Sequence, residues 1–91
     1  MTNSYKGSTV PRAPDINRLR LYERIGRRIR KVRNEKQMEV GELATRSGTI
    51  QQSISKIEQG EMPPPVHLLV AIAKALGVTL NDLVPMEESD G

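Results

Sequence analysis

The sequence contains no cysteine, no tryptophan and no phenylalanine, and its only aromatic side chains are Tyr5 and Tyr22. A chain of 91 residues has the size of one small domain. Its hydrophobic core must therefore be aliphatic, built from Leu, Ile, Val, Met and Ala. Without cysteine the chain forms neither disulfides nor thiolate metal sites, which is compatible with a reducing cytosol.

Long apolar runs are also lacking. The N-terminal stretch MTNSYKGSTVPRAP has no apolar segment, so it does not have the pattern of a secretory signal. The most apolar stretch, VHLLVAIAKALGV, is shorter than the roughly 18 apolar residues that a membrane span requires, and Lys74 interrupts it. We therefore expect no membrane partner.

Residue sets that carry chemistry are absent as well. His67 is the only histidine, has no acidic cluster beside it in the sequence, and is expected on an exposed helix face. The segment MEESDG has carboxylates but lacks the loop spacing of a calcium site, and the chain has no glycine-rich phosphate loop. We expect no enzymatic activity, no metal and no cofactor.

Charge is present but unevenly divided. The net charge is +3, yet residues 1–40 hold eleven Lys or Arg against four Asp or Glu, while residues 41–91 hold three against seven. A basic N-terminal half indicates a polyanionic partner, nucleic acid first. The open alternative is a solvated basic helix face with no ligand.

Apolar residues recur at helical spacing throughout, and no strand pattern is recognisable, so the sequence predicts an all-α domain. A first helix begins near Asn17, because four apolar residues form one stripe from there onward: Leu21, Ile25, Ile29 and Val32. Gly26 lies inside this pattern. It costs roughly 1 kcal/mol relative to Ala unless another segment packs closely against it.

Four shorter helices are expected after a break near Gln37. They lie at residues 40–46, 51–59, 65–76 and 80–84, separated by Gly48, Gly60 and Gly77 and closed by Pro85. Pro65 is expected as a first helical residue, and Thr79 as a cap. Their predicted core residues are Leu43, Ala44, Ile54, Ile57, Val66, Leu69, Ile72, Ala73 and Leu76.

The chain thus divides into a disordered N-terminal arm at 1–16, a helical domain at 17–86 and an acidic flexible tail at 87–91. Two short helices joined by SGTI, the second with polar outer residues, have the arrangement of a helix-turn-helix. Long amides such as Gln51 and Gln52 on the outer face of such a helix are either ordinary surface residues or readers of a partner.

The run from Ile25 to Leu83 resembles the phage-repressor and Cro-like helix-turn-helix family, also called the XRE family. Separate signals carry the resemblance: IGRRIRKVR, the pair Leu43-Ala44, Gly48, ISKIEQG, a proline-bearing loop before LLVAIAKALGV, and TLNDLV. GTIQQSI is most similar to the reading helices of lambdoid phage repressors. The resemblance implies a compact five-helix bundle of the lambda-repressor type.

The function implied by this resemblance is sequence-specific binding of double-stranded DNA by a transcriptional regulator, with repression as the expected mode. It also implies a cytoplasmic protein, bacterial or phage-encoded and associated with the nucleoid. Two alternatives stay open: a protein-binding module of the same fold, of the antitoxin or coactivator type, and the N-terminal DNA-binding domain of a longer regulator.

Base contacts are implied at the start of the third helix. The amides of Gln51 and Gln52 match N6 and N7 of adenine, and a bidentate pair is worth roughly 1–3 kcal/mol of discrimination. Ser55 and Lys56 lie one turn further on. Ile50, just before the helix, is placed to touch a thymine methyl group.

Phosphate contacts are implied at Arg30 and Arg33 of the first helix and at Ser53. Arg33 and Glu58 match positions that often form a structural ion pair in the family. The N-terminal arginines add phosphate contacts only if the arm reaches the DNA; they are Arg12, Arg18 and Arg20.

The sequence departs from the family pattern at the start of the second helix. A Ser or Thr cap followed by a phosphate-binding Gln is usual, whereas Glu39 and Val40 stand there. The cap of the first helix is usually Gly and is Gln37 here. Glu61 occupies a loop that is often basic. These changes reduce the usual phosphate clamp, and we expect a weaker intrinsic affinity for DNA, partly offset by the arginines of the first helix.

A homodimer is expected from apolar residues thought to lie off the core. These are Leu68, Leu80, Val84 and Met86, which would form an exposed patch. A two-fold dimer reads half-sites roughly 34 Å apart. The alternative is a loosely covered edge of the core.

Overall fold

The computed structural model describes residues 16–84, which form five helices and no strand. The helices are α1 (Ile16–Glu35), α2 (Val40–Ser47), α3 (Gln51–Glu58), α4 (Val66–Leu76) and α5 (Leu80–Leu83). The predicted five-helix, all-α fold is therefore confirmed. The expected tail 87–91, the candidate dimer residue Met86 and all but the last residue of the expected arm lie outside the described residues.

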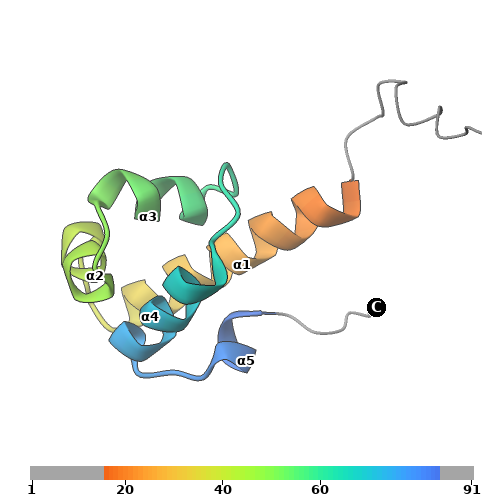
Figure 1. Ribbon diagram of the computed structural model, residues 1–91. Coiled ribbons are helices and arrows are strands. Elements are labelled where there is room, and N and C mark those ends of the chain that lie inside the picture. Colours follow the sequence, from red (N-terminus) through yellow and green to blue (C-terminus); the bar gives the residue numbers. More distant parts are fainter. Residues whose placement is uncertain (1–15, 85–91) are drawn as a thin grey trace, which may run out of the picture.

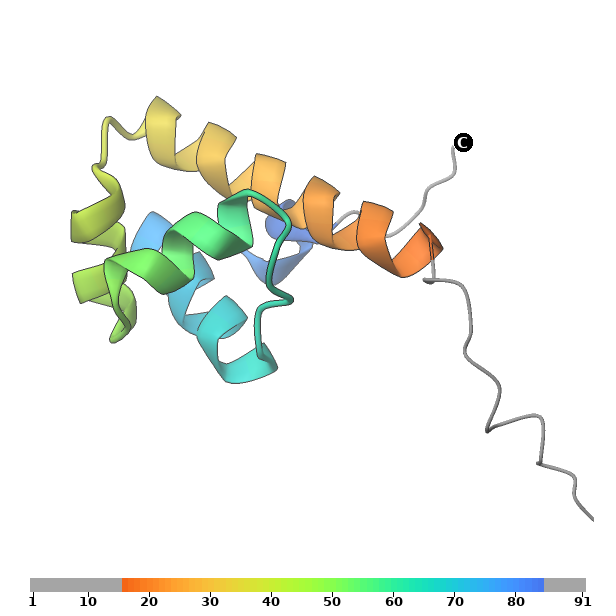
Figure 2. The ribbon, with the colours of Figure 1, turned by 90° about the horizontal axis from the view of Figure 1, so that it is seen from above.

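Helix α1 runs along one side of the molecule, and the other helices pack beside its C-terminal half (Figures 1 and 2). Helix α3 contacts both α1 and α2, α4 contacts α2, and α5 contacts both α1 and α4. The N-terminal turns of α1, at residues 16–20, extend beyond this group and are exposed. The arrangement leaves the outer faces of α1 and α3 open to solvent.

The core is aliphatic, as the absence of Trp and Phe requires. Its largest fully buried side chains come from all five helices: Ile29, Leu43, Ile54, Ile57, Ile72, Leu76 and Leu83. Leu21 and Val32 of the predicted α1 stripe are half-buried against this cluster. Burial of these side chains, at about 25 cal/mol per Å² of apolar surface, is the main force that holds the helices together.

Gly26 explains how closely α1 and α3 approach. A Cβ atom at this position would collide with the carbonyl oxygen of Ile57 and would lie 2.6 Å from that of Glu58. The backbone of α3 therefore rests directly on Gly26. The cost of glycine within a helix is offset here by the close contact between the two helices.

Two residues with positive φ delimit α2. Gly48 closes the helix with φ 75°, and the amide of Thr49 donates to the carbonyl of Ala44 at 2.9 Å, which satisfies the C-terminal turn. Gln37 links α1 to α2 with φ 56°, an unusual conformation for a residue other than glycine. Gly48 thus acts as predicted, whereas Gln37 adopts the glycine-like conformation at a cost.

The prediction for α4 was right for Leu69, Ile72, Ala73 and Leu76, which are buried, but wrong for Val66 and Leu68. Leu68 is only 6% exposed and belongs to the core, whereas Val66, predicted to be buried, is 75% exposed. The core face of α4 also includes Leu69 and Ile72, and Leu68 lies on it because residues four apart share one face of a helix. Leu68 is therefore not part of an exposed patch.

The ends of α4 and α5 follow from their caps. Pro65 precedes α4 as its cap rather than as its first residue, and its carbonyl accepts a hydrogen bond from the amide of Leu69 at 2.9 Å. Thr79 caps α5, as predicted. Its hydroxyl accepts from the amide of Asp82 at 3.3 Å, and the carboxylate of Asp82 accepts from the amide of Thr79 at 2.9 Å.

Candidate nucleic-acid interface

Helices α2 and α3 pack against each other across the turn at Gly48 and Thr49, with α3 on the outside of the molecule (Figure 1). Ile54 and Ile57 fix α3 because they are 0% and 1% exposed. Ile50, the cap residue just before α3, has an extended backbone and is 61% exposed. The helix is therefore held by its inner face and presents its polar face to solvent.

Four of the predicted base-contact residues come together on that outer face. Gln51, Gln52, Ser55 and Lys56 line one shallow depression, and all but the half-buried Ser55 are exposed. Ser53 is half-buried and does not line it. Donors and acceptors from two turns of the helix thus form one continuous polar surface.

Two further residues line the same depression and were not predicted, namely Gln59 and Glu61. Gln59 follows Ser55 by four residues, and Ser55 follows Gln52 by three, so helical periodicity alone could have identified Gln59. Glu61 was assigned to the connecting loop. Its amide donates to the carbonyl of Lys56 at 2.9 Å, and this turn, closed at Gly60, keeps Glu61 beside α3.

The start of α2 is shaped to fit Gln51. A Cβ atom on Gly41 would lie 3.2 Å from Oε1 of Gln51, which is a tight contact. The side chain of Gln51 therefore lies over Gly41, near the positive N-terminal end of α2. Glu39, at the cap position of α2, makes no side-chain cap hydrogen bond. Gly41 thus accommodates the amide rather than strengthening the helix.

The ion pair predicted between α1 and α3 is present on the inner side of α3. Arg33 Nε is 2.6 Å from Glu58 Oε2, and Arg33 Nη2 is 2.9 Å from Oε1. Arg33 Nη1 also donates to the carbonyl of Met38 at 2.9 Å. Arg30 Nε adds a contact of 3.3 Å to Glu58 Oε1. One buried carboxylate therefore ties the end of α1 to α3.

The two arginines that contact Glu58 differ in how far their side chains are buried. The side chains of Glu58 and Arg33 are 2% and 11% exposed, whereas that of Arg30 is 50% exposed. The hydrogen bond to Glu58 raises the pKa of Arg33 above its ordinary value, although burial acts in the opposite direction. Arg33 is thus a structural cation, and Arg30 presents more of its charge to a ligand.

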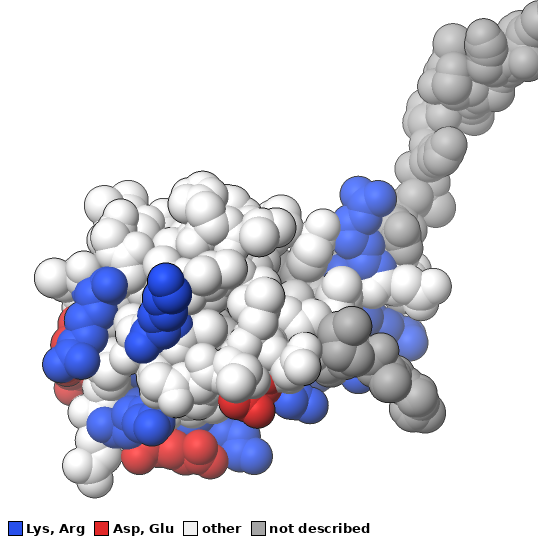
Figure 3. Space-filling model, turned by 60° about the horizontal axis from the view of Figure 1, so that its bottom comes forward, with Lys and Arg blue, Asp and Glu red and all other residues white. Residues whose placement is uncertain are grey.

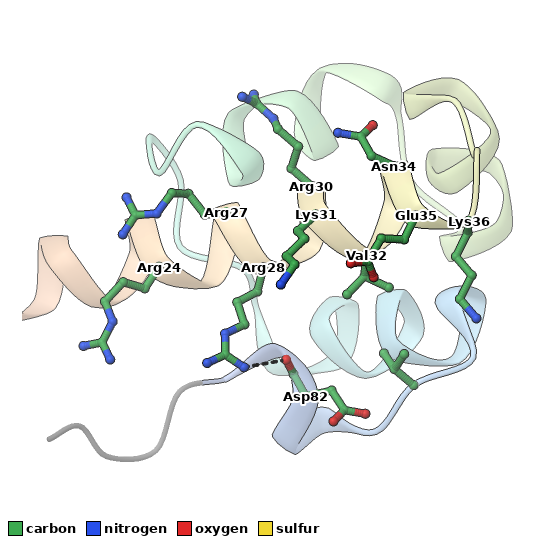
Figure 4. A pocket seen from close by; sticks show the side chains of 11 residues that line it. Arg24, Arg27, Arg28, Arg30, Lys31, Val32, Asn34, Glu35, Lys36 and Asp82 are labelled. Atoms are coloured by element: carbon green, nitrogen blue, oxygen red, sulfur yellow. Dashed lines mark hydrogen bonds between the residues drawn. The ribbon is translucent and has the colours of Figure 1, made fainter. Parts of the chain in front are cut away.

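The outer face of α1 forms an open basic groove. Its lining consists of the cations Arg24, Arg27, Arg28, Arg30, Lys31 and Lys36, with Val32, Asn34, Glu35, Val78 and Asp82. Arg30 and Asn34 point toward the side of α3, Arg27 extends along α1 toward its N-terminal end, and Arg24, Arg28 and Lys31 point toward α5 (Figure 4). In Figure 3, Lys and Arg side chains gather toward the edges of the face shown, and few lie at its centre.

The remaining predicted residues are separate from this interface. Leu80 is 39% exposed and Val84 is half-buried, so these two residues of the expected dimer patch reach the surface, while Leu68 does not. His67 is exposed, as expected. Among residues 16–84, no group of three His, Cys, Asp or Glu residues is arranged to hold a metal ion. In the same range, no helix combines the length and apolarity needed to cross a membrane.

The sequence resembles known regulators. Residues 29–83 match the family model for helix-turn-helix proteins. Over 66 residues the chain is 38% identical to the uncharacterized HTH-type transcriptional regulator y4dJ of Sinorhizobium fredii, covering 71% of this chain and 86% of that protein. Over 58 residues it is 40% identical to the uncharacterized regulator y4dL of the same organism, covering 64% of this chain but only 30% of that longer protein.

Solved structures give the same fold. The clp gene regulator ClgR of C. glutamicum is 30% identical with a TM-score of 0.67, over 69% of this chain and 82% of its own. The hypothetical transcription factor NHTF from Neisseria, at 24% identity, has a TM-score of 0.68 over 82% and 84% of the two chains. The restriction-modification controller protein C.AhdI of Aeromonas hydrophila, also at 24% identity, has a TM-score of 0.67 over 68% of this chain and 94% of its own. The two more distant matches bear on the fold alone.

Proposed function

The chain belongs to the helix-turn-helix family of DNA-binding transcription regulators, and from this premise we propose that it is a repressor that reads bases in the major groove with α3. A repressor of this kind occludes a promoter by occupying its operator. The proposal assigns the protein no catalytic activity and no cofactor. It applies to a cytoplasmic protein acting on double-stranded DNA.

The observation that carries the proposal is the surface formed by Gln51, Gln52, Ser55 and Lys56 on a helix whose opposite side is fully buried. Helices of this type read bases mainly with their N-terminal residues, where both glutamines lie. An amide side chain pairs with N6 and N7 of adenine, and Lys56 suits guanine or a phosphate. Ile50, being exposed, suits a thymine methyl group.

Phosphate contacts position such a helix and supply most of the affinity. Arg30 suits this role because half of its side chain is exposed beside α3. For Ser53 and Arg33 the role is weaker, since Ser53 is half-buried and Arg33 uses three of its N–H groups within the protein. We therefore assign the leading phosphate contact to Arg30.

Two-fold dimerisation is the proposed mode of operator recognition. Leu80 and Val84 supply the exposed apolar surface, and a dimer would present two α3 helices to half-sites roughly 34 Å apart. Sedimentation of the wild type and of Leu80→Glu tests this point. A monomeric wild type at concentrations that saturate DNA would refute it.

The base-reading proposal is tested by selecting bound sequences from a random duplex pool at two salt concentrations. The wild type should select a motif with one or more A·T pairs, and Gln51→Ala/Gln52→Ala should lose preference at those positions. Asn81→Ala, which removes an exposed amide from α5, is the control and should leave the motif unchanged.

The second candidate function is a protein-binding module of the same fold. Glu39 favours it, since this exposed carboxylate stands at the start of α2, where DNA-binding members of the family carry phosphate contacts. If the wild type binds DNA in a salt-dependent way without any motif, and the glutamine variant behaves identically, the protein-binding function replaces base reading.

A further inference from the structure

The basic groove of α1 is a charged feature that base reading by α3 does not use. Six Lys or Arg residues line it against two acids, Glu35 and Asp82. Arg28 donates to the backbone carbonyl of Asp82 at 3.1 Å, and Arg30 contacts Glu58. The excess of positive charge in this groove favours the binding of an anionic ligand.

Two neighbouring cations of the groove combine exposure with the absence of a partner in the described part of the chain. Arg27 and Lys31 lie one turn apart on α1, and both side chains are exposed. Within residues 16–84, no hydrogen bond or ion pair of either side chain is present. Their charges therefore contribute little to folding and are available to a ligand.

The spacing of these cations suits a DNA strand. From Arg24 to Lys31 the helix makes about two turns, a rise of roughly 10.5 Å. Because one DNA strand carries a phosphate about every 3.4 Å along the axis, this span faces about three phosphates. Four of the six cations within the groove are arginines, whose planar guanidinium pairs with phosphate oxygens in a bidentate way.

The position of the groove favours nucleic acid over an acidic protein. Arg30 points to the side of α1 on which α3 lies, Arg27 extends along α1 toward its N-terminal end, and Arg24 and Lys31 continue the positive surface toward α5 (Figure 4). A duplex held by α3 would bring its own backbone to this side first. At the start of α2, by contrast, the carboxylate of Glu39 stands where a hydrogen-bond donor to a DNA phosphate is usual.

We propose that the outer face of α1 binds the sugar–phosphate backbone of the DNA that flanks the half-site, on the same duplex that α3 reads. The contact is independent of base sequence and supplies affinity that the altered start of α2 does not. This inference rests on the proposed DNA-binding function, but it concerns a different surface and a different property, the dependence of binding on flanking length and salt.

The test compares the wild type with Arg27→Gln/Lys31→Gln on two duplexes, one limited to the selected site and one extended by flanks on both sides. Each phosphate contact contributes about −0.9 to the slope of log affinity against log salt. On the extended duplex, the variant should therefore lose about 2 from the magnitude of this slope. On the short duplex its slope should match that of the wild type.

A control with the same loss of charge is Arg46→Gln/Lys74→Gln, which removes two exposed cations from α2 and α4. It should change the slope less than the α1 variant on the extended duplex. An unchanged slope for Arg27→Gln/Lys31→Gln would refute the α1 contact, and equal losses on both duplexes would refute its placement on flanking DNA.

These outcomes remain separable from the proposed base reading. The α1 variant should select the same motif as the wild type, because its contacts carry no sequence information. If the glutamines do not read bases, the wild type selects no motif, or Gln51→Ala/Gln52→Ala selects the same motif as the wild type. The salt dependence of binding to extended and short duplexes can still be measured in either case, and it tests the α1 contact separately.

Discussion

At the scale of single residues, Glu58 connects the fold to the proposed interface. Its carboxylate lies between Arg33 and Arg30 and is 2% exposed at the side chain. A buried ion pair adds little net stability compared with an apolar replacement, but removal of one partner strands the other charge. The arrangement fixes α3 relative to α1, and the half-exposed Arg30 adds positive charge beside α3.

We predict that Glu58→Ala lowers the free energy of unfolding by roughly 3–5 kcal/mol, because Arg33 would remain charged and largely buried without its partner. Urea denaturation measures the effect. Glu42→Ala, which breaks the exposed pair with Arg46, should cost no more than about 0.5 kcal/mol. Similar losses for the two variants would contradict the structural role of Glu58.

Gly26 gives a second prediction at this scale. Gly26→Ala should destabilise the protein by about 2 kcal/mol or more, since its Cβ would collide with the backbone of α3, which cannot move as a flexible side chain can. Gly41→Ala is the matched control, because its Cβ meets only the end of the Gln51 side chain. It should leave stability equal or higher by up to about 1 kcal/mol. Thermal melting of both variants decides the point.

At the scale of elements, the connection from α1 to α2 stores a small strain. Gln37 has φ 56°, a conformation that costs most residues roughly 1–2 kcal/mol and glycine much less. We predict that Gln37→Gly raises the free energy of unfolding by up to about 1 kcal/mol, after the greater entropy of glycine in the unfolded chain is counted. A variant less stable than the wild type in chemical denaturation would show that the Gln37 side chain stabilises the fold.

The short helix α5 gives a prediction that involves pH. The amide of Thr79, and then its hydroxyl, hold the pKa of Asp82 below its ordinary value. A depressed carboxylate pKa contributes stability that is present above the unfolded-state pKa and is lost as pH falls through the folded-state pKa. We predict that Thr79→Ala raises the pKa of Asp82 by removing the hydroxyl contact. NMR titration of the carboxyl carbon measures it, and an unchanged pKa would contradict the assignment.

Element positions were largely predictable, but not which of Val66 and Leu68 on α4 is buried. The turn at Gly48 and the inner face of α3 follow from glycine chemistry and from the spacing of Ile54 and Ile57. By contrast, Val66 and Leu68 are each followed by apolar residues at helical spacing. The sequence alone therefore allows either Val66 or Leu68 to be buried. The choice is made by packing against the neighbouring helices, which places Leu68 in the core.

The candidate site was predictable to a similar degree. Gln51, Gln52 and Lys56 are recognisable from their positions on an amphipathic helix. The contact between Gln51 and Gly41 joins two helices, and the place of Glu61 beside α3 depends on the turn at Gly60, so neither follows from local periodicity. Tertiary contacts also decide that Arg33 is buried and Arg30 exposed.

At the scale of the whole molecule, the uneven charge of the sequence becomes an uneven surface. The positive charge of the N-terminal half lies mostly on α1, the one helix that extends beyond the compact group. The depression on the outer face of α3 is nearly neutral, with Lys56 and Glu61 as the charged residues that line it. We therefore assign base discrimination to α3 and much of the electrostatic affinity to α1.

The central claim, that the amides of α3 read adenine in the major groove, is tested most directly by a double-mutant cycle between protein and DNA. The two changes are Gln51→Ala/Gln52→Ala and replacement of each adenine in the selected site by 7-deazaadenine, which lacks the N7 acceptor. We predict coupling of roughly 1–3 kcal/mol at one or more adenines, because each change then removes the same contact. Additive losses at every adenine would contradict the claim.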